Sequence, residues 1–196
     1  MRTITYPDTT LKNINTTIGI SGTRLCGKDF IAKIISDKLD LPTASLADPI
    51  KDQYSTLMDI PLESLYTQGE DKEMHRLGLI ALGALRRSQH IDWWCEDLHK
   101  KYTRSSVIIP DIRFKNEVEY FKKHSNKFVL FNVIADKSSL IERGWKPSFA
   151  DTTSTEMGIQ EFRNDIDYTI NNSNSMIHSI KGLLNKVLNQ FDLLNT

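Results

Sequence analysis

Hydrophobic residues along the chain follow two different spacings. Short apolar runs predict buried strands at 17–21, 105–111 and 127–136, and weaker runs predict shorter strands at 43–46 and 167–172. Between these runs, apolar residues recur every three or four positions, which predicts helices at about 30–39, 47–58, most of 61–102, 113–124 and from 174 onward. In the second of these helices, Asp48 is the expected N-cap and Pro49 lies in the first turn.

Strands that alternate with helices predict an α/β fold in which a parallel β-sheet is flanked by helices on both faces. Ligands of such folds bind at the carboxyl ends of the strands. The length of 196 residues is typical of one domain. We expect a single domain at 17–196, preceded at 1–16 by a segment rich in Thr and Asn that forms a loose arm or an extra edge strand.

A glycine-rich stretch lies at the first of these strand ends. Gly22, Gly27 and Lys28 match the G-x-x-x-x-G-K pattern of the phosphate-binding loop, whose backbone N–H groups wrap around phosphates. The stretch separates a predicted strand from a predicted helix, which is the context that this motif requires. We therefore expect Lys28 to reach the outer phosphates of a nucleoside triphosphate. The remaining loop residues that we expect at this site are Thr23, Arg24 and Cys26.

Two aspartates are candidates for holding Mg²⁺ near this loop. Asp29 stands where the motif usually has a Ser or Thr hydroxyl, and it either holds Mg²⁺, directly or through water, or caps the helix that begins there. Asp111 follows the apolar run at 107–109, so it either organises Mg²⁺ at a strand end or is the N-cap of the next helix. Arg113, two residues later, is suited to pair with a phosphate through its bidentate fork.

Further basic and aromatic residues are candidates for an acceptor pocket and for a lid. Arg143 follows the strand at 127–136, and we expect either a lid at about 140–158 that closes on the transferring phosphates or a solvated loop. The mostly helical stretch at about 48–102 is the expected acceptor-binding insertion, in which cations clamp a phosphate and aromatic rings stack on a base. Alternatively, its aromatic rings are core and its cations form a solvated helix face. Its candidate residues are Lys51, Arg76, Arg86, Arg87 and Trp93.

The net charge of the chain argues against two classes of binding partner. Lys plus Arg and Asp plus Glu both number 25, and this neutrality argues against a nucleic-acid polymer or a membrane surface as partner. Cys26 and Cys95 lack metal or redox spacing, which favours free thiols in a reducing cytosol. No apolar run has the length of a membrane span or of a signal peptide core, so we expect a soluble, cytoplasmic protein. The neutral charge still allows a local basic pocket for a small anion, and the partner that we expect there is a small-molecule phosphate acceptor.

Three segments together resemble a known family. "GTRLCGKD", "LGLIALGALRRSQHIDWW" and "VIIPDIRFKNEVEYF" are similar to the G-K-D, L-G-x-x-x-R and D-x-R-F-x-N-E segments of the deoxynucleoside monophosphate kinases of the phage type. A second resemblance is to the animal-type phosphomevalonate kinases. It rests on the S-G-x-R-x-x-G-K-D loop, "ADPIKDQY", Lys72-Glu73 followed by Arg76, Arg143-Gly144-Trp145, and the acidic segment around 154–158. The region beyond residue 140 favours the second family, and the helix at 113–124 favours the first.

Both resemblances imply a P-loop kinase that uses ATP and Mg²⁺ to phosphorylate a phosphate. The first implies a deoxynucleoside monophosphate as acceptor, and the alternative is 5-phosphomevalonate. In either case Lys28, Asp111, Arg113 and Arg143 would be catalytic, and Asp29 and Asp111 would place Mg²⁺. A non-catalytic nucleotide-binding switch also stays open, although the N-K-x-D segment that a guanine-specific switch uses is absent from the sequence. Relatives of these kinds often pair, which leaves a homodimer open.

Overall fold

The computed structural model describes residues 12–66, 70–147, 158–174 and 179–194. The strands are β1 (Ile14–Ser21), β2 (Val107–Ile109), β3 (Ser125–Ile134) and β4 (Tyr168–Asn171). The α-helices are α1 (Lys28–Leu39), α2 (Asp48–Met58), α3 (Glu70–Gln89), α4 (Trp93–Tyr102), α5 (Lys115–His124), α6 (Lys137–Glu142) and α8 (Ile180–Gln190). Short 3-10 helices lie at η1 (Leu62–Leu65), η3 (Gly158–Glu161) and η4 (Arg163–Asp165).

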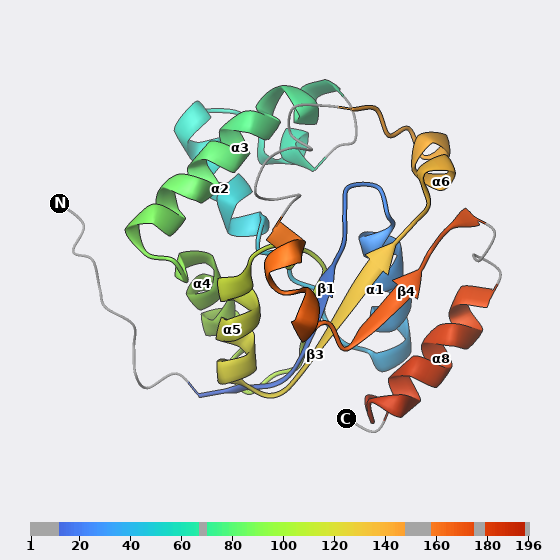
Figure 1. Ribbon diagram of the computed structural model, residues 1–196. Coiled ribbons are helices and arrows are strands. Elements are labelled where there is room, and N and C mark those ends of the chain that lie inside the picture. Colours follow the sequence, from blue (N-terminus) through green and yellow to red (C-terminus); the bar gives the residue numbers. More distant parts are fainter. Residues whose placement is uncertain (1–11, 67–69, 148–157, 175–178, 195–196) are drawn as a thin grey trace.

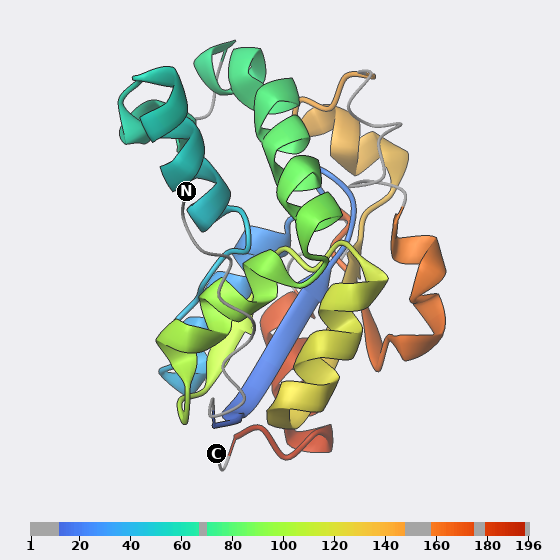
Figure 2. The same ribbon diagram turned by 90° about the vertical axis from the view of Figure 1, so that its left-hand side faces the viewer.

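The four strands form one parallel sheet in the order β2-β1-β3-β4 (Figure 1). In β1, Gly19 pairs with Ile109 of β2 on one side and with Leu130 of β3 on the other. Because all strands run the same way, their carboxyl ends share one edge of the sheet. The helices α2 and α3 lie beyond this edge (Figures 1 and 2).

Two hydrophobic clusters cover the two faces of the sheet. One cluster packs α1 and α8 against the sheet through fully buried residues such as Ile31 and Leu184. The other packs α4 and α5 against the opposite face through residues such as Leu98 and Phe121. The predicted α/β fold, with a parallel sheet flanked by helices on both faces, is therefore confirmed.

The structure corrects several expected boundaries. β1 begins at Ile14, three residues earlier than predicted, and Ile14 is fully buried. The predicted strand at 43–46 is reduced to a single bridge between Thr43 and Ile108. The N-cap of α2 is Ala47, so Asp48 is its first residue and not its cap. Residues 1–11 of the expected arm and 148–157 of the expected lid lie outside the described residues.

Candidate active site

The loop between β1 and α1 has a backbone that only glycine fits at two positions. Gly22 has φ 141° and Gly27 has φ 94°. A methyl group on Gly22 would lie 2.3 Å from the carbonyl oxygen of Val133, and one on Gly27 would lie 2.1 Å from Nδ2 of Asn172. Because the N-cap position of α1 is Gly27, no side chain caps its first backbone N–H groups. Such an uncapped helix start is suited to bind an anion.

The loop residues predicted at the nucleotide site all lie on this turn. Lys28 is 9% exposed, and its Nζ donates a hydrogen bond to the carbonyl of Thr23 at 2.9 Å. Arg24 donates to the carbonyl of Lys146 at 2.7 Å, which ties the loop to the segment after α6. Cys26 is fully buried. The ammonium of Lys28 therefore lies folded over the loop that is expected to hold phosphates.

Arg143 lies against the same loop, on the side of β4. Its Nη1 donates to the carbonyls of Leu25 at 3.3 Å and Cys26 at 3.1 Å. Its Nη2 donates to the carbonyl of Asn172 and, at 2.9 Å, to Oδ1 of Asn174. The guanidinium thus joins the loop backbone to the carboxyl end of β4. A contact with transferring phosphates stays a prediction.

Asn172 is a site residue that the sequence analysis did not identify. It is 2% exposed, its Nδ2 donates to the carbonyl of Cys26 at 2.9 Å, and its Oδ1 has no hydrogen-bond partner among the described residues. The available signal was the run Asn171-Asn172-Ser173-Asn174, which is polar and begins at the last residue of β4. Together Arg143 and Asn172 form one wall of the loop.

Asp111 lies at the carboxyl end of β2 and binds the segment before α2. Its Oδ2 accepts from Oγ of Ser45 at 2.6 Å and from the N–H of Ala47 at 2.9 Å, and its Oδ1 accepts from the N–H of Leu46 at 2.9 Å. The N-cap alternative for Asp111 is wrong, because Phe114 occupies the N-cap position of α5.

Glu117 closes the loop that carries Asp111 and Arg113. Its Oε2 accepts from the N–H of Arg113 at 2.7 Å and from that of Phe114 at 3.0 Å. Burial raises the pKa of Glu117 to about 7, although these two N–H donors favour its ionised form. Glu117 therefore fixes the backbone of Arg113 from within the core. The sequence analysis did not place it in the site.

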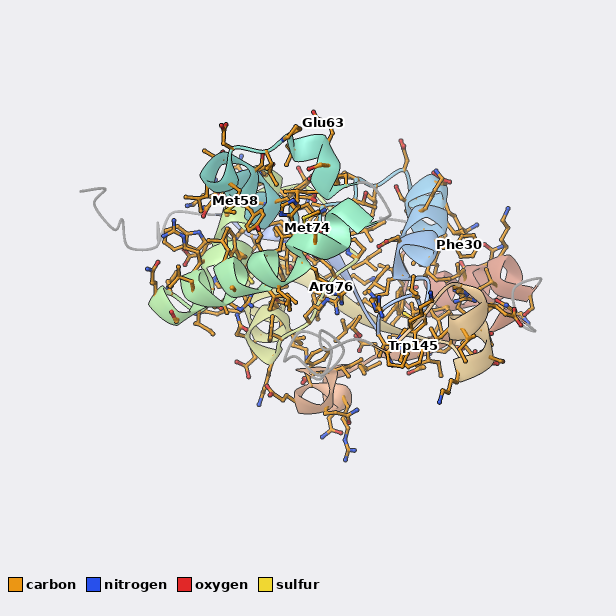
Figure 3. All side chains as sticks on the ribbon, turned by 90° about the horizontal axis from the view of Figure 1, so that it is seen from above. Phe30, Met58, Glu63, Met74, Arg76 and Trp145 are labelled. Carbon is orange, nitrogen blue, oxygen red and sulfur yellow. The ribbon has the colours of Figure 1, made fainter. Side chains whose placement is uncertain are left out.

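The cations predicted on the acceptor side come from α2 and α3. Arg87 places its guanidinium 4.2 Å from the ring centre of Phe114, in the loop after β2. Arg76 precedes Arg87 by eleven residues, which is about three helical turns, so both project from the same side of α3. In the view from above, Arg76 lies beside α3 and Trp145 lies beside α6 (Figure 3).

Arg86 and Trp93 form a contact of their own at the end of α3. The guanidinium of Arg86 lies 5.1 Å from the ring centre of Trp93, and it donates to Oε1 of Gln53 at 3.2 Å and of Gln89 at 3.1 Å. Trp93 also packs against the core cluster of α4 and α5. These contacts turn Arg86 toward neighbouring helices and cover part of the Trp93 ring.

Lys51 points along α2 toward η1. Its Nζ lies 3.3 Å from Oδ1 of Asp48 and 3.8 Å from the ring centre of Tyr66. The hydroxyl of Tyr66 donates to the same Asp48 oxygen at 3.0 Å, and burial together with Asp48 raises the pKa of Tyr66 to about 12. Lys51 is therefore held in a small polar cluster whose side chains converge on Asp48.

The aspartate that follows the loop lysine is exposed. Asp29 lies in the first turn of α1 beside a cavity of about 350 Å³, which Thr43 and Pro110 also line. Among the described residues no group of three or more His, Cys, Asp or Glu could hold a metal ion. Mg²⁺ in kinase sites is usually bound by one or two carboxylates together with substrate phosphates and water, and the exposed carboxylate of Asp29 fits that arrangement.

Comparison with known proteins identifies the family. A family model for phosphomevalonate kinase matches residues 20–127, which is more than half of the chain and runs from β1 into β3. The chain belongs to the phosphomevalonate kinase family. It is 22% identical over 166 residues to the phosphomevalonate kinase of Drosophila melanogaster, a match that covers 80% of this chain and 88% of that protein.

A second relative and two solved structures complete the comparison. The chain is 27% identical over 131 residues to a putative deoxynucleotide monophosphate kinase of Acanthamoeba polyphaga mimivirus, covering 54% of this chain and 68% of that protein. A gluconokinase from Sinorhizobium meliloti 1021 has the same fold, with a TM-score of 0.53, 10% identity and coverage of 94% and 98% of the two chains. A shikimate kinase from Bacteroides thetaiotaomicron also has this fold, with a TM-score of 0.50 and 14% identity. That match covers 89% of this chain and 98% of the shikimate kinase.

Both resemblances that the sequence motifs indicated are thus confirmed. This member of the phosphomevalonate kinase family has the fold of a P-loop kinase, and a kinase of this fold acts on a small molecule. Among the helices that the structure describes, none has the length and apolar character needed to cross a bilayer.

Proposed function

We propose that the chain transfers the γ-phosphoryl group of ATP to the phosphate of 5-phosphomevalonate. The observation that carries this proposal is the position of Arg87, which rests on Phe114 beside the loop after β2 and shares one side of α3 with Arg76. Within the described part of the chain, no residue accepts a hydrogen bond from Arg87. We propose that this guanidinium binds the phosphate of the acceptor, because arginine binds a phosphate through two parallel hydrogen bonds.

The residues of the chain supply positioning and charge compensation. Phosphoryl transfer through a loose transition state needs an in-line arrangement and cancellation of negative charge, with little covalent work by the protein. Lys28 and the N–H groups of the loop are placed to hold the outer phosphates of ATP, and Arg113 to offset charge on the transferred group. The acceptor phosphate is already ionised, so no strong base is required.

Magnesium enters this scheme through Asp29. When bound, the ion would neutralise charge on the β- and γ-phosphates of ATP. Asp29 would hold it directly or through water, because its carboxylate is exposed beside the loop lysine. We also propose that the segment after α6 excludes water, since Arg24 already joins the loop to Lys146.

The chemistry of the acceptor pocket favours 5-phosphomevalonate over a nucleotide. 5-Phosphomevalonate is anionic at both ends, with a phosphate and a carboxylate, and it has no ring that needs stacking. The acceptor side carries Arg76 and Arg87 on α3 and Lys51, which is paired with Asp48, on α2. A nucleotide base would need an open aromatic face, whereas the Trp93 ring is partly covered by Arg86 and by the core.

A deoxynucleoside monophosphate is the second candidate acceptor. The similarity to the mimivirus protein supports it, as does the presence of Trp93 near the acceptor-side arginines. Rotation of Arg86 away from Trp93 would open a stacking face for a base. The two candidates therefore differ in whether Arg86 must move.

The test is a direct assay of the purified chain. It is mixed with ATP, Mg²⁺ and either 5-phosphomevalonate or each of the four deoxynucleoside monophosphates, and both ADP and the phosphorylated product are measured. We expect product with 5-phosphomevalonate. If only a deoxynucleoside monophosphate is phosphorylated, the second candidate acceptor is correct. If none of the acceptors is phosphorylated, both candidates are rejected.

The loop lysine provides a further test. Lys28→Ala should abolish turnover and keep the fold. Lys33→Ala, which changes an exposed lysine of the same helix, should keep both the turnover and the fold.

A further inference from the structure

The carboxylate of Asp111 has three donors, and all come from the segment before α2. They are the hydroxyl of Ser45 and the backbone N–H groups of Leu46 and Ala47, at 2.6–2.9 Å. Neither of these two N–H groups donates to a neighbouring strand, because the pairing of this segment with β2 stops at Thr43 and Ala44. The N–H of Leu46 therefore depends on Asp111, whereas that of Ala47 is shared between Asp111 and Oγ of Ser45, which lies 3.1 Å away.

The position of Asp111 is itself set by the sheet. The N–H of Ile112 donates to the carbonyl of Ile20 at 3.1 Å, which extends the pairing of β2 with β1 past Asp111. Ile20 lies two residues before Gly22, at the start of the phosphate-binding loop. On its other side, Asp111 holds Ala47, the N-cap residue of α2, and Lys51 follows one turn later. Asp111 is therefore the connection between the loop that binds ATP and the helix that bears an acceptor-side cation.

The segment at 111–117, which comprises the loop after β2 and the first turn of α5, also contacts α3 and the start of α4. Phe114 lies under the guanidinium of Arg87 from α3. Asn116 donates through its Nδ2 to the carbonyl of Ile91 at 3.0 Å and to Oδ1 of Asp92 at 3.1 Å, directly before α4. The segment at 111–117 thus contacts α2, α3 and the start of α4, and within it Asp111 is the contact to α2.

We propose that Asp111 is a positioning residue that acts through the first turn of α2, fixing where Lys51 meets the acceptor, and that the metal is held by Asp29 and not by Asp111. This inference rests on the proposed function. Oδ2 of Asp111 already accepts two hydrogen bonds and Oδ1 accepts one, so a direct metal bond would have to use the lone pair of Oδ1 that remains. Asp29, by contrast, is exposed.

Steady-state kinetics separate the two roles of an aspartate. In Asp111→Ala we expect the KM for the acceptor to rise about tenfold or more, with the KM for ATP and the half-saturating Mg²⁺ concentration within about threefold of wild type. In Asp29→Ala we expect the half-saturating Mg²⁺ concentration and the KM for ATP to rise, with the KM for the acceptor close to that of wild type. Asp111→Asn should be intermediate, because its amide keeps one acceptor oxygen but turns an N–H₂ toward a backbone donor. Asp37→Ala, an exposed acid of α1, is the matched control.

A tenfold rise in half-saturating Mg²⁺ with an unchanged acceptor KM in Asp111→Ala would overturn the proposal. Two further measurements do not depend on the acceptor or on turnover. In Asp111→Asn, amide hydrogen exchange at 46–52 should be faster than in wild type, and calorimetric binding of Mg²⁺ with ATP should be unchanged. Unchanged exchange at 46–52 would reject the inference. If the wild-type chain phosphorylates none of the acceptors, the proposed function fails, and these two measurements still decide the role of Asp111.

Discussion

The guanidinium of Arg143 donates a hydrogen bond to the backbone carbonyl of Cys26 at 3.1 Å, and the amide of Asn172 donates to the same oxygen at 2.9 Å. The conformation of the phosphate-binding loop therefore depends on two side chains that follow it by more than a hundred residues. Neither contact involves a phosphate. Both hold the carbonyl of the residue before Gly27, the position at which the loop enters α1.

The first prediction concerns this brace. Arg143→Ala should raise the KM for ATP about tenfold, because the loop loses the donors that hold the carbonyls of Leu25 and Cys26. Arg143→Lys should recover only part of the loss, since one ammonium cannot reproduce a planar fork of donors. The measurement is the ATP KM, with Arg163→Ala, an exposed arginine of η4, as the control. An unchanged ATP KM in Arg143→Ala would show that the loop keeps its shape without Arg143.

The second prediction concerns Gly27. Gly27→Ala should lower the free energy of unfolding by roughly 1–3 kcal/mol and abolish ATP binding, because φ is 94° and the added methyl meets Asn172. The matched control is Gly182→Ala in α8, where a methyl group has nothing within 4 Å and alanine should stabilise the helix by about 0.5–1 kcal/mol. Chemical denaturation and nucleotide titration check both variants. If Gly27→Ala binds ATP as tightly as wild type, the loop at 22–28 is not the ATP-binding site.

The third prediction is a pH dependence from Glu117. Its pKa in the folded chain, about 7, is above its ordinary value of 4.5 in an unfolded chain. Its contribution to stability is therefore fully present below about pH 4.5 and is lost as the pH rises through 7. Glu117→Gln keeps an acceptor oxygen without a charge, so its stability should gain on that of wild type by about 1–3 kcal/mol between pH 5 and 8. The measurement is chemical denaturation of both proteins across this pH range. A difference in their free energies of unfolding that does not change with pH would refute the raised pKa of Glu117.

The fourth prediction distinguishes two neighbouring arginines. Arg87→Lys should raise the KM for the acceptor about tenfold and leave the KM for ATP unchanged, because lysine loses both the stacking on Phe114 and the bidentate fork. Arg86→Lys should have a smaller effect, since Arg86 is directed to Gln53 and Gln89. The measurement is the acceptor KM of the two variants side by side. A larger effect of Arg86→Lys would favour the nucleotide, whose base would stack near Trp93.

Local patterns were sufficient where the structure depends on neighbours in the chain. The two glycines and the lysine predicted the loop, because the motif is a continuous strand, turn and helix start. Apolar spacing predicted α1, α5 and α8 and the buried strands β2 and β3. The same local reasoning failed at 43–46, where the pattern predicted a strand. There Asp111 takes the backbone donors of Leu46 and Ala47, and no sequence pattern within that segment shows this competitor.

The sequence by itself determined that the chain alternates strands and helices around a glycine loop, because backbone geometry and side-chain spacing act over a few residues. Only the tertiary structure decided what the charged residues near that loop contact. Arg143 binds loop carbonyls, Asp111 binds the start of α2, and Glu117 is buried beneath Arg113. A charged side chain has several partners of similar chemistry along the chain, and the packing of the sheet and helices determines which of them comes within hydrogen-bond distance.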